Sequence, residues 1–132
     1  MTLFIASFGA TAVLLYGLPQ SPLSQPRNVV GGQVISALVG CTIRLIFGAN
    51  GETFVAITLS VCVTLLIMQL TKTMHAPAGA TAVIAITASA PFPWAGYQFV
   101  LMPVLSSSVI LLVIAVVVNN LVSNRHYPCF WW

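Results

Sequence analysis

The chain carries very little charge. Its 132 residues include four lysine or arginine residues and one acidic residue, Glu52, so charged residues make up 4% of the sequence. Soluble domains carry about 25% charged residues, because their surfaces must be hydrated. Hydrophobic residues make up 59% of the chain, and the mean hydropathy is +1.05. These values exclude a soluble protein and predict an integral membrane protein embedded in a lipid bilayer.

Groups that could perform catalysis or hold a metal ion are also scarce. One acidic residue excludes the paired carboxylates of many acid–base mechanisms. His75 and His126 have no recognisable serine or cysteine nucleophile beside them, and Cys41, Cys62 and Cys129 lack the spacing of metal ligands. The few basic residues are scattered and make no patch for nucleic acid. The sequence therefore predicts no enzyme activity, no cofactor, no metal site and no nucleic-acid partner.

The charged residues divide the chain into apolar runs, and a membrane helix needs about 20 residues. The last run is too long for one helix, but Pro91 and Pro93 interrupt it. The sequence thus predicts an all-α, polytopic membrane bundle forming a single domain over residues 1–132. Five segments are expected, at residues 2–18, 28–48, 53–71, 76–90 and 97–122.

The basic residues predict the orientation of these segments. The loops that contain Arg27, Lys72 and Arg125 alternate onto one side, which the positive-inside rule makes cytoplasmic. Arg44 falls toward the opposite side. The opening residues lack a basic region and a small-residue cleavage site, so no cleaved signal peptide is expected.

One short string occurs twice. GATAV begins at Gly9 and again at Gly79, and a proline-rich stretch follows each copy. The copies lie in the first and fourth segments, three segments apart, so the second copy should lie upside down relative to the first. Inverted repeats are typical of transporters, whose substrate sites lie where the repeats meet. Residues 4–50 and 74–120 are therefore predicted to be inverted copies.

Small residues have two interpretations in a membrane protein. In GATAV, Gly9 and Thr11 either permit tight helix packing or line a passage, and both roles are compatible. Gly32, Ser36 and Gly40 form a row at four-residue spacing, which predicts a packing face. Such a face could also join two copies, so a homo-oligomer is expected.

The second GATAV follows a histidine and a proline. Proline is favoured in the first turn of a helix, so the fourth segment should begin near Ala76, directly after His75. Unpaired N–H groups at a helix start can bind an anion. Gly79 and Ala80 would keep that place open, and Thr81 would add a hydroxyl. The sequence predicts an anion site here.

Alternatives remain for the polar residues. His75 is either an interfacial loop residue or a ligand that gains charge near its ordinary pKa of about 6.5. Arg27 and Lys72 favour a role in topology over one in binding. Arg44 either reaches the interface or draws anions toward an outer vestibule. Asn28 is expected to lie with His75, Thr81 and Thr11 along a common route for a transported solute.

Two stretches, SPLSQPRNVVGG at residues 21–32 and HAPAGATAV at residues 75–83, resemble the HPP family of small membrane proteins. The resemblance extends from Phe4 to Asn120. The family's motif is usually HPPAGATA, and here Ala76 replaces its first proline. The matching positions are His75, Pro77, Ala78, Gly79, Ala80, Thr81 and Ala82. Family members in plants and cyanobacteria are associated with nitrite movement, so the resemblance implies a nitrite transporter in a bacterial cytoplasmic membrane or a plastid envelope.

The sequence thus supports two hypotheses. The first is a transporter or channel for a small monovalent anion, with nitrite as its substrate. The second is a non-transporting membrane subunit that packs against a partner protein. The first hypothesis assigns substrate binding to His75, Pro77, Gly79, Ala80, Thr81, Gly9, Thr11, Asn28 and Arg44.

Overall fold

A computed structural model describes residues 2–47, 53–87 and 96–131, and their regular structure is helical. The helices are α1 (Thr2–Gly17), η1 (Pro22–Ser24), α2 (Pro26–Phe47), α3 (Thr53–Thr71), α4 (Ala78–Thr87), η2 (Val100–Leu105) and α5 (Ser106–Leu121). The all-α fold with five segments is confirmed. The second segment begins two residues earlier than predicted and the fourth two residues later. Pro91, Pro93 and the predicted end of the fourth segment lie outside the described residues.

Within the described residues, three helices are long and apolar enough to cross a membrane. They cover Pro26–Phe47, Phe54–Thr71 and Val100–Leu121. α4 has only 10 residues, which corresponds to about 15 Å of helix. A hydrocarbon core is about 30 Å thick, so α4 alone reaches across roughly half of it.

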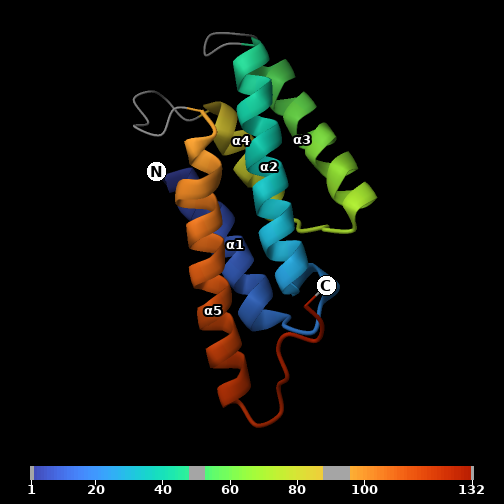
Figure 1. The fold of residues 1–132 in the computed structure, drawn as a ribbon, viewed down its shortest axis with the longest axis vertical. Coiled ribbons are helices and arrows are strands. Elements are labelled where there is room, and N and C mark those ends of the chain that lie inside the picture. The colour runs from blue at the N-terminus through green and yellow to red at the C-terminus, as the bar shows by residue number, and fades with distance from the viewer. Residues whose placement is uncertain (1, 48–52, 88–95, 132) are drawn as a thin grey trace.

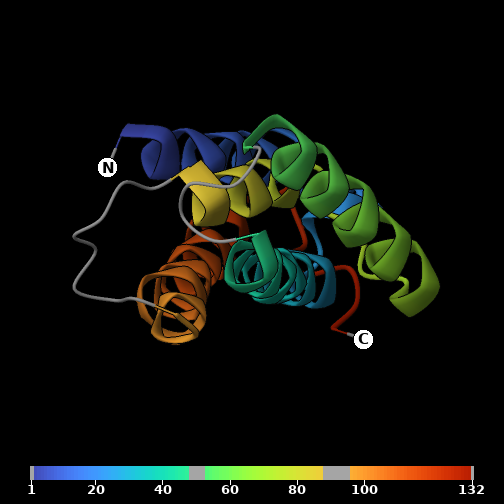
Figure 2. The ribbon, with the colours of Figure 1, turned by 90° about the horizontal axis from the view of Figure 1, so that it is seen from above.

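Consecutive helices run in alternating directions along the long axis of the molecule (Figure 1). Viewed from above, α4 lies between α1 and α2, and α3 flanks it (Figure 2). This position suits the composition of α4, because alanines and a threonine form most of its buried face. A short helix of small residues is thus surrounded by longer ones.

Glycines on α2 allow this close packing. A Cβ atom on Gly40 would lie 2.5 Å from the Cβ of Ala85, and one on Gly32 would lie 2.6 Å from the Cβ of His75. The predicted packing role of the row that includes Gly32 and Gly40 is therefore confirmed. The row contacts α4 and the loop before it, within the same chain. A second copy would have to use another face, and the homo-oligomer remains a prediction.

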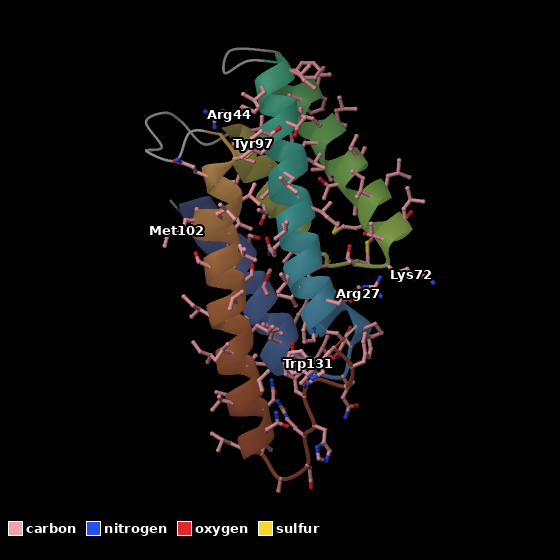
Figure 3. The ribbon with its side chains drawn as sticks, viewed as in Figure 1. Arg27, Arg44, Lys72, Tyr97, Met102 and Trp131 are labelled. Carbon is pink, nitrogen blue, oxygen red and sulfur yellow. The ribbon has the colours of Figure 1, made fainter. Side chains whose placement is uncertain are left out.

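Basic residues lie near the ends of α2 and α3. Arg27 lies at the start of α2 and Lys72 just after the end of α3, whereas Arg44 lies toward the other end of α2, beside Tyr97 (Figure 3). Arg27 donates a hydrogen bond to the carbonyl of Thr71, at 2.7 Å. The separation of Arg27 from Arg44 agrees with the alternating loops, and the compartment that each end faces remains a prediction.

The inverted repeat also remains a prediction. α1 and α4 run in opposite directions (Figure 1), as that hypothesis requires. Any bundle with alternating helices would place its first and fourth helices in this way. Superposition of residues 4–50 on 74–120 is the test, and residues 48–50 and 88–95 fall outside the described part of the chain.

Candidate functional site

Five polar side chains meet in the interior where α1, α2, α4 and the loop before α4 converge. They are Ser7 and Thr11 of α1, Gln33 of α2, His75 of the loop and Thr81 of α4, and each is 0% exposed. We call this group the His75 cluster. Polar side chains are rarely buried in a membrane protein without a structural partner or a function.

Helical spacing brings these residues inside. Ser7, Thr11 and Leu15 are the buried residues of α1 among those whose side chains are described, and they are spaced four apart on one face. Thr81 lies on the buried face of α4. The threonines of the two GATAV strings, Thr11 and Thr81, therefore both point into the same cluster.

His75 is held at both ring nitrogens. Its Nδ1 lies 2.8 Å from the carbonyl oxygen of Leu23, and its Nε2 lies 3.1 Å from the hydroxyl of Thr11. A carbonyl oxygen only accepts hydrogen bonds, so Nδ1 carries the proton and donates to Leu23. In the neutral ring Nε2 can only accept, so the single proton of the Thr11 hydroxyl is shared between Nε2 and the carbonyl of Ser7, which lies 3.0 Å from the same hydroxyl. The imidazole is therefore fixed in one tautomer and one orientation.

Gln33 connects the remaining members of the cluster. Its Oε1 accepts a hydrogen bond from Thr81 at 2.6 Å. Its Nε2 donates to Thr11 at 3.2 Å and to Ser7 at 3.4 Å. Ser7 also lies 2.7 Å from the hydroxyl of Thr81 and donates to the carbonyl of Pro77 at 3.0 Å. Every side chain of the His75 cluster therefore has a partner within it or in the adjoining backbone.

Burial changes the acid–base behaviour of His75. Removal from water lowers its pKa from 6.5 to about 4, although its hydrogen bond to Leu23 acts in the opposite direction. The expectation that His75 gains charge near neutral pH is therefore wrong. The interpretation of His75 as an interfacial loop residue is also wrong, because the loop folds inward and buries the imidazole.

The start of α4 differs from the prediction as well. The helix begins at Ala78, and its first N–H groups donate to carbonyls three residues earlier. The pairs are Ala78 with His75 at 3.0 Å, Gly79 with Ala76 at 3.2 Å and Ala80 with Pro77 at 3.1 Å. Tight turns of this kind often satisfy the first donors of a helix. The predicted set of unpaired N–H groups is therefore absent from this helix start.

The other predicted residues separate into two groups. Gly9 and Ala80 are exposed, and no atom lies within 4 Å of a Cβ built on Gly9 or Gly79. These three residues do not border the His75 cluster. Asn28 is buried and donates to the carbonyl of Met74 at 2.8 Å, which fixes the loop that carries His75.

Arg44 lies far from the cluster, toward the opposite end of the bundle (Figure 3). It is partly buried and donates to the carbonyl of Ala85 near the end of α4, at 3.2 Å. Of the nine predicted site residues, the structure thus brings together His75, Thr11, Thr81 and the carbonyl of Pro77.

Comparison with known proteins identifies the family. Residues 1–128 match the family model described as "HPP, transmembrane region". The chain belongs to the HPP transmembrane family. Ala76, which replaces the first proline of the family's motif, is exposed, so this replacement leaves the buried contacts of His75 in place.

Two curated relatives of this HPP protein are transmembrane proteins of Dictyostelium discoideum. They are 42% and 45% identical to it over 133 residues, and the alignments cover 100% and 99% of the chain. The same alignments cover 46% and 42% of the relatives. The chain thus spans less than half the length of these proteins. No solved structure matches it significantly.

Sequence reasoning about the HPP chain missed Ser7 and Gln33. A signal for each was present. Ser7 lies four residues before Thr11, hence on the same helix face. Gln33 carries a polar amide within a long helix in which apolar residues otherwise predominate. Their partners, however, lie on other helices, and only the three-dimensional packing reveals them.

The loop whose Leu23 carbonyl accepts the hydrogen bond from His75 is itself held in place by the C-terminal segment. The Tyr127 hydroxyl donates to the carbonyl of Ser24 at 2.6 Å. Burial raises the pKa of Tyr127, so its hydroxyl stays protonated. Gln25 accepts the N–H of Cys129 at 2.9 Å. Leu23, directly before these two anchored residues, therefore presents its carbonyl to His75 from a well-supported position.

Proposed function

We propose that this HPP protein transports a small monovalent anion, with nitrite as the first candidate, along a path that includes the His75 cluster. The observation that carries the proposal is the complete burial of five polar side chains that contact one another in the interior of the bundle. Burial of polar groups in a membrane is costly, and proteins usually retain such groups where solutes pass.

The chemistry of the cluster suits an anion. Ser7, Thr11 and Thr81 offer hydroxyl protons, and Gln33 offers an amide N–H2 group. Hydrogen bonds to a charged partner contribute about 1.5–3 kcal/mol each. The cluster contains no carboxylate that would repel an anion. A nitrite ion carries two oxygens close together, which two or three of these donors could bind at once.

His75 has a different role from the predicted one. Its Nδ1 proton is already donated to Leu23 and its Nε2 accepts from Thr11, so the neutral ring has no donor left for an anion. We assign it as a positioning residue, which orients Thr11 toward Gln33. In this arrangement each donor is bonded to an acceptor of the cluster or of the adjoining backbone, so the path is closed. An entering anion would replace the contact between Thr81 and Gln33.

The competing function is a non-transporting subunit. Complete pairing of the His75 cluster favours it, because a purely structural network would also be fully paired. Such a subunit does not need hydrogen-bond donors that can exchange their partners for a solute, so transport measurements separate the two functions.

The test is nitrite entry into liposomes that contain the purified protein, compared with nitrate, formate and chloride and with protein-free liposomes. Thr81→Val removes a hydroxyl of the cluster with little change in shape. The matched control is Thr58→Val, because Thr58 is exposed on α3 and bonds only its own helix at the carbonyl of Phe54. Thr81→Val should reduce nitrite flux about tenfold, which corresponds to the loss of one charge-assisted hydrogen bond. Thr58→Val should leave it unchanged. Entry of all four anions at the protein-free rate would reject the proposal.

A further inference from the structure

The buried side chains of α3 form one row, and Val63 and Ile67 pack beside it against α2. Ala56 is 3% exposed, and Ser60, Thr64 and Met68 are each 0% exposed. They are spaced four residues apart, so they lie along one face of the helix. The other side chains of α3 that the structure describes are partly or fully exposed. Two of the four residues in this buried row are therefore hydroxyl residues.

These two hydroxyls are unusual because they are unpaired. Among the described residues, the Oγ of Ser60 and the Oγ1 of Thr64 are the buried side-chain oxygens without a hydrogen-bond partner. Thr58 and Thr71 on the same helix instead donate to carbonyls four residues earlier, at 2.9 and 2.8 Å. An unpaired buried hydroxyl destabilises a fold, so alanine and valine would serve packing better. Ser60 and Thr64 thus point to a ligand rather than to packing.

The register between α2 and α3 shows what these hydroxyls face. The helices are antiparallel (Figure 1). The sulfur of Met68 lies 3.3 Å from the position of a Cβ on Gly32, and Ala56 clusters with Val39 and Ile43. Thr64 lies one turn before Met68 on α3. Because the helices are antiparallel, Thr64 is level with the α2 residue one turn after Gly32, and Ser60 is level with the α2 residue two turns after Gly32.

From this register, we expect the α2 residues at these two levels to be Ser36 and Gly40. Ser36 is fully buried and donates to the carbonyl of Gln33 at 2.9 Å, so the lower level adjoins the His75 cluster. A Cβ on Gly40 would lie 2.9 Å from the carbonyl oxygen of Ala82. The upper level therefore borders α4, whose last turn is contacted by Arg44. The hydroxyls continue from the His75 cluster toward the end of the bundle that carries Arg44.

We propose that Ser60 and Thr64 form a second binding station for the transported anion, between α3 and the α2–α4 pair. The proposal rests on the proposed function, because it names further residues on the same path. The ligand is a small monovalent anion with its remaining water, which accepts a hydrogen bond from each hydroxyl. α3 is the helix that gives way to admit it, because most of its described side chains are partly or fully exposed.

Flux and stability measured together test the station. In the double variant Ser60→Ala/Thr64→Val, we expect nitrite flux to fall about tenfold, while the melting temperature in detergent stays equal to the wild-type value or rises. Thr58→Val is the control and should change neither quantity. Unchanged flux would overturn the proposal, because the row would then serve packing alone. A lower melting temperature would also overturn it, because the hydroxyls would then have structural partners.

A second experiment does not depend on the identity of the substrate. In a protein with Cys41, Cys62 and Cys129 replaced by alanine, Ser60→Cys and Thr64→Cys are treated with a water-soluble methanethiosulfonate reagent. Both should react, and nitrite should slow the reaction several-fold. Leu66→Cys is the control.

Leu66 is 57% exposed on the outer face of α3, and a thiolate does not form readily in lipid. It should therefore not react. Absence of reaction at both Ser60→Cys and Thr64→Cys would overturn the second station, even if the protein transports nitrite. Reaction at both positions without transport of any anion would reject nitrite transport but retain an aqueous path.

Discussion

Two buried polar regions of the described chain, the His75 cluster and the row on α3, both contain serine and threonine hydroxyls, but these hydroxyls differ in their hydrogen bonding. In the His75 cluster, Ser7, Thr11 and Thr81 all bond other polar groups. In the row on α3, Ser60 and Thr64 have no partner among the described residues. A hydroxyl in the first region stabilises the fold, whereas one in the second destabilises it. Removing hydroxyls should therefore change stability in opposite directions.

The largest loss is expected where one residue supports the most partners. Gln33→Leu removes the contacts to Thr81, Thr11 and Ser7 together. It should lower the free energy of unfolding by about 4 kcal/mol, because several buried groups lose partners at once. Gln69→Leu is the control, since Gln69 is exposed on α3, and it should change stability by less than about 0.5 kcal/mol. Chemical unfolding in detergent micelles measures both. Equal stabilities would show that Gln33 does not organise the cluster.

His75→Ala should have the next largest effect. His75 is fully buried, so its side chain contributes to the packing of the interior. The variant leaves a cavity and removes the hydrogen bond to Thr11, so we expect a loss of about 3 kcal/mol. His126→Ala, at an exposed residue, should be neutral. The same unfolding assay distinguishes the two, and a neutral His75→Ala would contradict the burial of this loop.

The extent of sequence-based prediction can be judged from these residues. The all-α fold with five segments followed from charge, length and proline, which act locally. The inward positions of Thr11 and Thr81 were also anticipated, as parts of one route. The burial of His75 was not, because it depends on a loop that folds against Gly31 and Gly32. The sequence gives no direct sign of this contact, since it joins residues more than forty positions apart.

The anion site at the start of α4 failed as a prediction for a related reason. Proline spacing correctly placed a helix there, within two residues. It does not determine whether the first N–H groups stay unpaired or close a tight turn on His75, Ala76 and Pro77. Likewise, the polarity of Ser60 and Thr64 was visible in the sequence, but their lack of partners depends on the register between α2 and α3.

A third prediction separates the regions by pH, because only the His75 cluster contains a titratable group. The pKa of His75 is about 4 in the folded protein, below its ordinary value of about 6.5. The unfolded chain therefore takes up a proton first, and stability present above pH 6.5 is lost as the pH falls toward 4.

Between pH 8 and pH 5, protonation of His75 in the unfolded chain should lower the free energy of unfolding by about 2 kcal/mol, at 1.36 kcal/mol per pKa unit. His75→Gln should abolish this slope and His126→Gln should keep it. Identical slopes in wild type and His75→Gln would mean that the imidazole is hydrated. Nitrite flux should not rise between pH 8 and pH 5.5, since His75 stays neutral there.

The smallest effect has the opposite sign. Thr64→Val replaces an unpaired buried hydroxyl with a methyl group of similar size, so no hydrogen bond is lost and the cost of burying the oxygen disappears. We expect the free energy of unfolding to rise by up to about 1 kcal/mol, whereas Thr81→Val in the His75 cluster should lower it by about 2 kcal/mol. The two substitutions are chemically identical and both sites are fully buried, so the difference isolates the effect of pairing. If both variants lose stability equally, Thr64 has a partner and the two regions are alike. If Thr64→Val gains stability but carries less nitrite, the hydroxyl has been retained at the expense of stability for the passage of a solute.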